Sequence, residues 1–351
     1  MNQSPEPPPD AATGFNKRLW FHAGLWGLFA VVAVLLRGPQ WDETLEQAQA
    51  LLGDPAYPDG HPFAVYVHNA YTIQIYLSAL VLSLGGSEAL LCGLRNVLFL
   101  LATVLPPFLL GAVATRRVVW GHVAVVLILA GIHLDFDSTY PQFVWPGVHS
   151  NGHIPLGVAL ASLALVIGGW HRLATFLIGL MPMLHLGQAP PVFLFAGLFG
   201  LWLIYRGDYR TLRRGAAGLA AGLLCCAVLW LAQQPFTAPI PDAGPYHSDV
   251  DIERLWRVYT FNYDFHRGAP VTGNSHIAVA AMLLVGAGLA LFEKRRDQAP
   301  WAWTWVAVYA FCVAAITWPI FVVHSLLGDQ TPYIFVSWLP YRLMNHVPVL
   351  L

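Results

Sequence analysis

Charged residues are scarce in this chain. Asp, Glu, Lys and Arg make up 11% of its 351 residues and hydrophobic residues 57%, whereas roughly a quarter of an ordinary soluble domain is charged. A soluble core of this size could not hide so much apolar surface, but the interior of a bilayer is itself apolar and about 30 Å thick. The composition therefore excludes an ordinary soluble protein and predicts an integral membrane protein.

Cysteine is also rare, and neither sign of charge dominates. The four cysteines lie in or beside apolar runs and form no CxxC pair, which argues against a disulfide framework and against a cysteine-based zinc site. The formal net charge is −1, so the overall charge predicts neither nucleic acid nor an anionic surface as a partner.

The N-terminal region lacks the pattern of a cleavable signal peptide. Residues 1–18 are polar and rich in Pro, which predicts a disordered tail. The apolar run that follows has Lys17-Arg18 before it and Arg37-Gly38-Pro39 after it, with no small-residue cleavage site. We interpret this run as an uncleaved first transmembrane helix.

Long apolar runs dominate the rest of the chain. They fall at about 19–36, 71–86, 97–113, 118–134, 154–169, 173–186, 190–205, 215–232, 276–292 and 301–323. In lipid every backbone amide must be bonded within its own segment, so these runs must be helices. We predict an all-α polytopic transmembrane bundle over 19–351, with about 9–11 spanning helices and with juxtamembrane helices in its outer loops.

Basic residues indicate the orientation. Twelve of the 18 Lys and Arg can be placed on one face, which the positive-inside rule assigns to the cytoplasm. The N-terminal tail is then cytoplasmic, and we expect a bacterial-type inner (cytoplasmic) membrane. The other side receives 13 of the 19 acids, in the loops 37–70, 135–153, 233–275 and 324–342.

One apolar run conflicts with this orientation. If both 71–86 and 97–113 crossed the bilayer, Arg116 and Arg117 would emerge on the outer face. Because 71–86 is short and ends in Gly-Gly, we predict that it is a juxtamembrane or re-entrant helix.

Two adjacent carboxylates, Asp42 and Glu43, follow the first apolar run and introduce the amphipathic stretch ETLEQAQALL. That stretch predicts a helix lying along the membrane surface. At headgroup depth the carboxylates could act as a general base or hold a divalent metal against a diphosphate. The alternative is that Asp42 caps the helix, because an acid suits a helix N-terminus.

A second acidic pair, Asp135 and Asp137, stands at the outer end of the run 118–134. These carboxylates could converge with Asp42 over one cavity, where Asp42 and Asp137 would ligate Mg²⁺ or Mn²⁺. The alternative is that they are ordinary loop acids, with Asp137-Ser138 in a turn.

Four histidines lie in the outer loops near these acids: His61, His68, His149 and His153. His149 and His153 are four residues apart, but the Ser-Asn-Gly between them is typical of a turn, which disfavours a shared metal on one helix. We expect these histidines to hydrogen-bond a phosphate or a sugar instead.

Arginine is uncommon on the predicted outer face. Four outer arginines are candidates for binding a donor's phosphate: Arg254, Arg257, Arg267 and Arg342. The guanidinium group binds phosphate through two parallel hydrogen bonds. For the loop 233–275 the alternative is a solvated amphipathic helix with internal salt bridges.

This order of features resembles the GT-C superfamily of polytopic glycosyltransferases: a first span, an acidic pair on the outer face, a juxtamembrane helix, and an acid in the second outer loop. In the family an Arg precedes a long helix that ends in a basic pair, matched here by Arg95 and Arg116-Arg117. The resemblance is one of pattern and covers about residues 15–180.

The resemblance implies transfer of a sugar from a polyprenyl-phosphate donor on the non-cytoplasmic face. Asp42, with Glu43 beside it, would match the catalytic or metal-binding acid. Asp135 or Asp137 would match the acid of the second outer loop. The implied partners are membrane lipid and the polyprenyl-phosphate sugar.

Two other functions fit the sequence. Apolar, Trp-rich helices would suit a non-catalytic subunit or scaffold of a larger complex, whose partners would be other membrane subunits. A transporter is less favoured, because no broken helices recur in matching halves and the acids lie in loops and not at mid-membrane depth.

Overall fold

The computed structural model describes residues 9–58, 61–131, 152–237 and 302–332, together with isolated positions at 284, 288 and 335. These residues form α-helices and short 3₁₀ helices, and no strand occurs among them. Five of the helices are long and apolar enough to cross a membrane, and four shorter apolar helices accompany them. The chain is therefore a multi-pass, all-α membrane protein, as its composition predicts.

The described helices follow the predicted apolar runs. In chain order they are α1 (Pro9–Arg37), α2 (Glu43–Leu52), α3 (Pro62–Asn69), α4 (Ile73–Ser83), α5 (Glu88–Thr115), α6 (Val118–Gly131), α7 (His153–Gly168), α8 (His171–Leu184), α9 (Ala189–Arg206), α10 (Tyr209–Gln233) and α14 (Ala302–Leu327). Three 3₁₀ turns extend them: η1 (Leu186–Gln188), η2 (Gln234–Phe236) and η4 (Gly328–Gln330).

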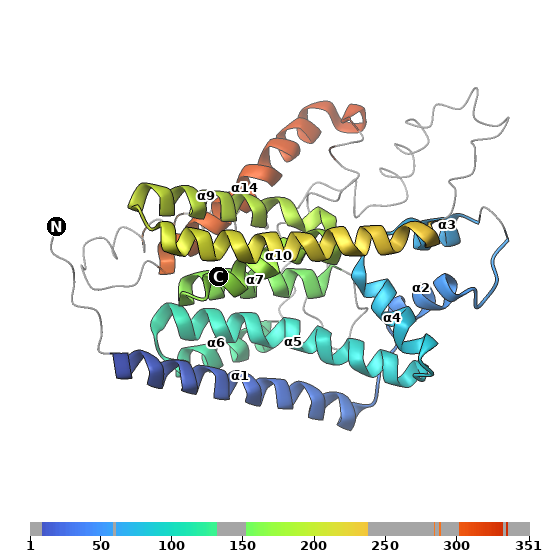
Figure 1. Cartoon of the computed structure of the whole chain (residues 1–351), viewed down its shortest axis with the longest axis horizontal. Coiled ribbons are helices and arrows are strands. Elements are labelled where there is room, and N and C mark those ends of the chain that lie inside the picture. The colour runs from blue at the N-terminus through green and yellow to red at the C-terminus, as the bar shows by residue number, and fades with distance from the viewer. Residues whose placement is uncertain are drawn as a thin grey trace.

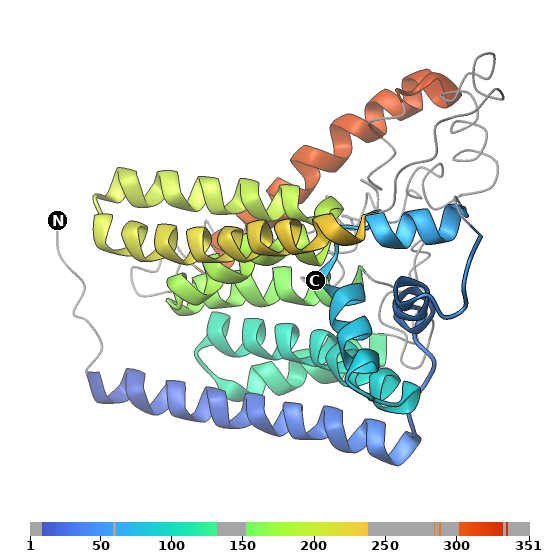
Figure 2. The ribbon, with the colours of Figure 1, turned by 45° about the vertical axis from the view of Figure 1, so that its right-hand side comes forward.

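Helices α1, α5, α9 and α10 run side by side, α14 leaves the bundle obliquely, and α2, α3 and α4 gather at one end (Figures 1 and 2). Helix α4 packs on α2 and touches α5 and α8 there, without running the length of the bundle. The chain thus leaves by α1 and returns by α5 to the end at which α1 began. This placement agrees with the prediction that 71–86 does not cross the membrane completely.

Cysteine labelling can test this passage. In a variant whose four native cysteines are replaced, a single cysteine at Leu84 is expected to react with an impermeant maleimide from the side opposite to cysteines at Lys17 and Arg117. Leu84 is 77% exposed at the end of α4, so its reactivity reports the side and not burial. Labelling of Leu84→Cys from the same side as Lys17→Cys would mean that α4 crosses the bilayer.

Helix α1 is longer than the apolar run that predicts it. It begins at Pro9 and so includes residues 9–18 of the segment expected to be a disordered tail. Proline's fixed φ suits a first helical turn, and the alanines that follow favour a helix. The helix ends at Arg37, because Gly38 adopts a φ of 81° and Pro39 comes next.

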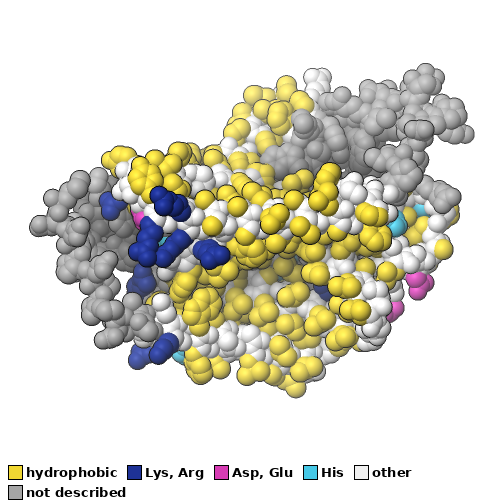
Figure 3. Space-filling view, viewed as in Figure 1, with side chains coloured by type: hydrophobic (Ala, Val, Ile, Leu, Met, Phe, Trp, Pro, Cys, Tyr) yellow, Lys and Arg dark blue, Asp and Glu magenta, His cyan; other side chains and the backbone are white. Residues whose placement is uncertain are grey.

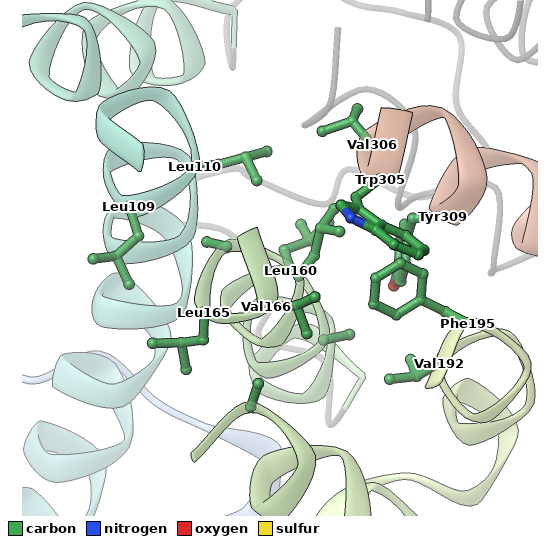
Figure 4. Packing of buried hydrophobic residues seen from close by; sticks show 14 of the residues in the cluster. Leu109, Leu110, Leu160, Leu165, Val166, Val192, Phe195, Trp305, Val306 and Tyr309 are labelled. Atoms are coloured by element: carbon green, nitrogen blue, oxygen red, sulfur yellow. The ribbon is translucent and has the colours of Figure 1, made fainter. Parts of the chain in front are cut away.

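The apolar core takes residues from α1, α5, α6, α7, α8, α9 and α14, and Figure 4 shows its part between α5, α7, α9 and α14. Leu110 of α5 and Leu160 of α7 belong to this cluster. The ring of Phe195 on α9 lies edge-on to Tyr309 of α14, with the centroids 5.4 Å apart. Lipid tails are as apolar as these side chains, so close packing, and not exclusion from water, holds such helices together.

Charges gather at opposite ends of the bundle (Figure 3). We call the end where α1 begins the basic end; it carries Lys17, Arg18, Arg116, Arg117, Arg172, Arg206, Arg210, Arg213 and Arg214. We call the opposite end, formed by α2, α3, α4 and the first turns of α5, the polar end. The flank between them is apolar, and in the view of Figure 3 it is hollowed between α10 and α5.

The predicted outer loops are only partly described. The loop 37–70 folds largely into α2 and α3, while α10 and η2 continue to Phe236 and α14 continues to Leu327. Residues 135–151 and 238–275 lie outside the described residues, as does the run 276–292 apart from positions 284 and 288.

Candidate functional site

Three helices of the bundle, α6, α7 and α8, are too short to reach the polar end. Helices α6, α7 and α8 contain 14, 16 and 14 residues, which corresponds to lengths of about 21–24 Å, less than the roughly 30 Å of a hydrocarbon core. Their ends at the basic end are level with Arg116-Arg117 and Arg172, so they stop short at the polar end. The start of α7 and the end of α8 therefore lie within the bundle, where their polar groups need partners.

Asp42 lies at the polar end, directly before α2. Its backbone is extended, and its carboxylate Oδ1 accepts hydrogen bonds from the backbone N–H of Thr44, at 2.9 Å, and from the Thr44 hydroxyl. Asp42 is thus the N-cap of α2, the alternative that its position before the helix predicts. The residue is only 1% exposed, so its carboxylate faces protein and not bulk water.

A buried ion pair links Asp42 to the bundle. The Nε of Arg95, on the second turn of α5, lies 3.3 Å from Asp42 Oδ1, and both side chains are buried. With two bonds from Thr44 and one from Arg95, Oδ1 is saturated. Oδ2 takes part in none of these three bonds.

The same guanidinium group continues the network into α4 and α8. Arg95 Nη1 donates to Gln74 Oε1 at 2.9 Å, and Gln74 Nε2 donates to the backbone carbonyl of Leu184 at 3.1 Å. Arginine has only donors and a carbonyl only accepts, so this chain of bonds fixes the orientation of the Gln74 amide. Thr72 also donates to the Leu184 carbonyl, which satisfies an end group of the short helix α8.

Further bonds fasten the first loop to the bundle. The backbone of Gln40 and the side-chain amide of Asn96 exchange two hydrogen bonds, at 2.7 and 3.2 Å. Between α3 and α4, the hydroxyl of Tyr71 donates to the carbonyl of Cys226 on α10. Burial is the main cause that raises the pKa of Tyr71 to about 12, so this hydroxyl keeps its proton at physiological pH.

His153 forms a second buried cluster where α7 begins. Its ring stacks on Phe99 of α5, with the centroids 3.9 Å apart, and its Nε2 lies 3.0 Å from the hydroxyl of Thr103. The same hydroxyl donates to the Phe99 carbonyl one turn earlier in α5, so Thr103 links the His153 ring to the backbone of α5. The sequence predicts that His153 lies in the outer loop 135–153. It is the last residue of that range and the first residue of α7, and it packs against α5.

The other predicted site residues are placed as follows. Glu43 is half-buried as the first residue of α2, and His61 is half-buried before Pro62, with its ring 4.6 Å from that of Tyr57. Asp135, Asp137, His149, Arg254, Arg257, Arg267 and Arg342 lie outside the described residues.

Metal ligation stays a prediction. Within the described parts of the chain, no three His, Cys, Asp or Glu side chains form a group that could hold a metal ion. The predicted pairing of Asp42 with Asp137 stays open, because Asp137 lies outside the described residues.

Sequence reasoning missed several residues of this site. Gln74, Thr103 and Gln188 are buried polar residues within or beside apolar runs, and Gln188 Nε2 donates to the Gly152 carbonyl at 2.7 Å. Arg95 entered only through the family resemblance and not as a site residue. These residues could have been found from the sequence as polar side chains within or beside apolar runs, since polar groups at membrane depth mark functional or packing sites by default.

Comparisons with known proteins give no independent guide to this site. No family model matches the chain, and no curated protein or solved structure is significantly similar to it.

Proposed function

We propose that the chain is a GT-C-like membrane glycosyltransferase that acts at its polar end. The donor would be a polyprenyl-phosphate sugar, which could approach through the apolar hollow between α5 and α10. In this proposal the basic end faces the cytoplasm of a bacterial-type inner membrane, and the polar end faces the other side.

One observation carries the proposal: the carboxylate of the first loop, Asp42, is buried at the polar end and held by Arg95. Charges at membrane depth are costly, so they are seldom kept without a role. A helix cap alone needs no buried arginine, because exposed aspartates cap helices equally well, as Asp208 does before α10. The pair with Arg95 therefore supports a carboxylate that is held in a fixed position for a further role.

The reaction would proceed by direct displacement at the sugar. The acceptor oxygen attacks the anomeric carbon, and the bond from that carbon to the phosphate oxygen breaks. The polyprenyl phosphate leaves with the bonding electron pair, while Oδ2 of Asp42 takes the acceptor's proton. Arg95 acts as a positioning residue, since it holds Oδ1 and so directs Oδ2.

The test is a transfer assay on the purified full chain in lipid nanodiscs. A panel of radiolabelled polyprenyl-phosphate hexoses is supplied with alcohol acceptors, and released polyprenyl phosphate is measured. Asp42→Asn is expected to lower turnover by at least about 100-fold, the lower range for loss of a general base. Asparagine caps helices as well as aspartate does, so the cap of α2 is retained.

Asp208→Asn is the matched control, because it makes the same change at a helix cap on the basic end; it is expected to leave turnover intact. The double variant Asp42→Asn/Arg95→Met removes both buried charges and separates folding from chemistry. If Asp42→Asn or the stable double variant transfers sugar at the wild-type rate, Asp42 is not the base and the assignment is wrong.

A specific observation favours a second candidate, a non-catalytic subunit. Three hydrogen bonds saturate Oδ1 of Asp42 and give it a complete structural role at the cap. This candidate predicts no turnover by the wild type with any donor of the panel. It also predicts purification from native membranes with other membrane subunits in fixed stoichiometry.

A further inference from the structure

Five arginines meet at one corner of the basic end, where α8 begins and α9 turns into α10. This arginine cluster consists of Arg172, Arg206, Arg210, Arg213 and Arg214, all of them exposed. The backbones of α8 and α10 approach closely here, because a Cβ on Gly218 of α10 would lie 2.2 Å from the carbonyl oxygen of Arg172. Figure 3 shows Lys and Arg side chains gathered over this corner.

Among the described residues, acidic side chains do not balance the cluster. Asp208 is the only acid between residues 172 and 214, and its carboxylate accepts a hydrogen bond from the N–H of Thr211 as the N-cap of α10. That bond is the largest cause that holds the pKa of Asp208 below its ordinary value. Among the described residues the five guanidinium groups form no ion pair with an acid, although Arg206 lies over the ring of Trp202.

Neither helix stability nor membrane orientation accounts for the concentration of these arginines at one corner. Arg210, Arg213 and Arg214 occupy the first two turns of α10, where the helix dipole disfavours cations. Membrane orientation requires an excess of Lys and Arg on this side but not their concentration at one corner. An anion bound outside the protein would offset the repulsion among these side chains.

The position of the arginine cluster along the membrane normal favours a lipid phosphate over a soluble anion. The apolar spans of α9 and α10 end at Arg206 and begin at Tyr209, so the arginines stand at the membrane surface. Tyr205 and Tyr209 are 88% and 55% exposed beside them, as in an interfacial aromatic belt. A phosphate at this level, with an apolar flank below it, belongs to a lipid.

We propose that the arginine cluster binds the headgroup of an anionic phospholipid. The phosphate lies against Arg210, Arg213 and Arg214, and the acyl chains lie along the exposed apolar surface of α9 and α10. This site is at the opposite end from the Asp42–Arg95 network and does not depend on the proposed transferase activity.

The test uses the purified full chain in phosphatidylcholine nanodiscs, with a fluorescent phosphatidylglycerol as the probe. Each basic residue contributes about a fivefold gain in affinity for an anionic membrane surface, so Arg210→Gln/Arg213→Gln/Arg214→Gln is expected to weaken binding by roughly 100-fold. The matching triple lysine variant keeps the charges and is expected to retain most of the affinity. Arg116→Gln/Arg117→Gln removes a basic pair elsewhere on the same end and is expected to change affinity little.

Three outcomes would overturn the proposal. The triple glutamine variant could bind the probe as tightly as the wild type, or the Arg116/Arg117 variant could lose affinity equally, in which case binding is a general surface effect. Displacement of the probe by millimolar inorganic phosphate would show a site for a soluble anion. Unchanged thermal midpoints in pure phosphatidylcholine confirm that the variants are folded. If the triple glutamine variant does not fold, the triple lysine variant is used in its place, and loss of its affinity for the probe would contradict the proposal.

Discussion

Replacing Arg95 with methionine is expected to lower the free energy of unfolding by about 3–5 kcal/mol, the usual cost of removing one partner from a buried ion pair. Asp42 is 1% exposed, so without Arg95 its negative charge would stay buried without the compensating positive charge, although the hydrogen bonds from Thr44 would remain. Gln74 would also lose its bond from Arg95. The measurement is the thermal or denaturant midpoint of the purified protein in one detergent.

Two further variants identify the cause of this loss. Asp42→Asn/Arg95→Met removes both charges and is expected to recover much of the stability, because the cost comes mainly from the unpaired charge and not from the missing contact. Arg214→Met makes the same substitution at an exposed arginine without an ion pair and is expected to stay within about 0.5 kcal/mol of wild type. An Arg95→Met protein as stable as wild type would mean that Arg95 and Asp42 are not paired in the folded chain.

Arg95→Lys gives an intermediate test of geometry. The guanidinium group reaches Asp42 through Nε and Gln74 through Nη1 at the same time. A single ammonium group keeps the charge but cannot reproduce this fork. Its expected stability therefore lies between those of the wild type and Arg95→Met.

The general architecture was predictable because it depends on patterns along the chain. Apolar runs predict the helices, and the paired arginines at 116–117 and 213–214 predict which ends lie together. The shortness of 71–86 and its Gly-Gly end predict a helix that does not cross, and α4 lies at the polar end as expected. These inferences need only composition, length and sign of charge.

The contacts of the site were not predictable in the same way. Asp42 and Arg95 are 53 residues apart, and their meeting depends on how α2 and α4 fold back against α5. The sequence left both a cap and a catalytic role open for Asp42; the cap is present, and the catalytic role stays a proposal. His153 illustrates the limit further, since its contacts with Phe99 and Thr103 depend on the packing of α7 against α5.

The start of α1 differs from the prediction for a different reason. Polar and Pro-rich composition predicts disorder over residues 1–18, but the helix begins at Pro9. A helix nucleated by a long apolar run can extend into adjoining polar residues at little cost, because each added residue gains a hydrogen bond once nucleation has occurred. Composition alone therefore misplaces the boundary.

Replacing Gly222 with alanine is expected to destabilise the protein by about 1–3 kcal/mol, the usual cost of overpacking. A Cβ at this position of α10 would lie 2.4 Å from the Phe176 carbonyl oxygen and 2.8 Å from the Cα of Gly179 on α8. These are backbone atoms, so the two helices would have to separate. Small residues permit such close helix approaches in membranes, as in the GxxxG pattern that Gly218 and Gly222 form.

The direction in which the thermal midpoint moves distinguishes Gly222 from an unconstrained glycine. In an exposed helical position with compatible geometry, a Gly→Ala change usually stabilises a protein by about 0.4–1 kcal/mol. Gly197 of α9 is such a position, because a Cβ there would meet no atom within 4 Å. Gly197→Ala is the matched control, expected to raise the thermal midpoint, whereas Gly222→Ala lowers it under the same conditions. Equal midpoints for the two variants would show that α8 and α10 stand further apart than the close approach at Gly222 implies.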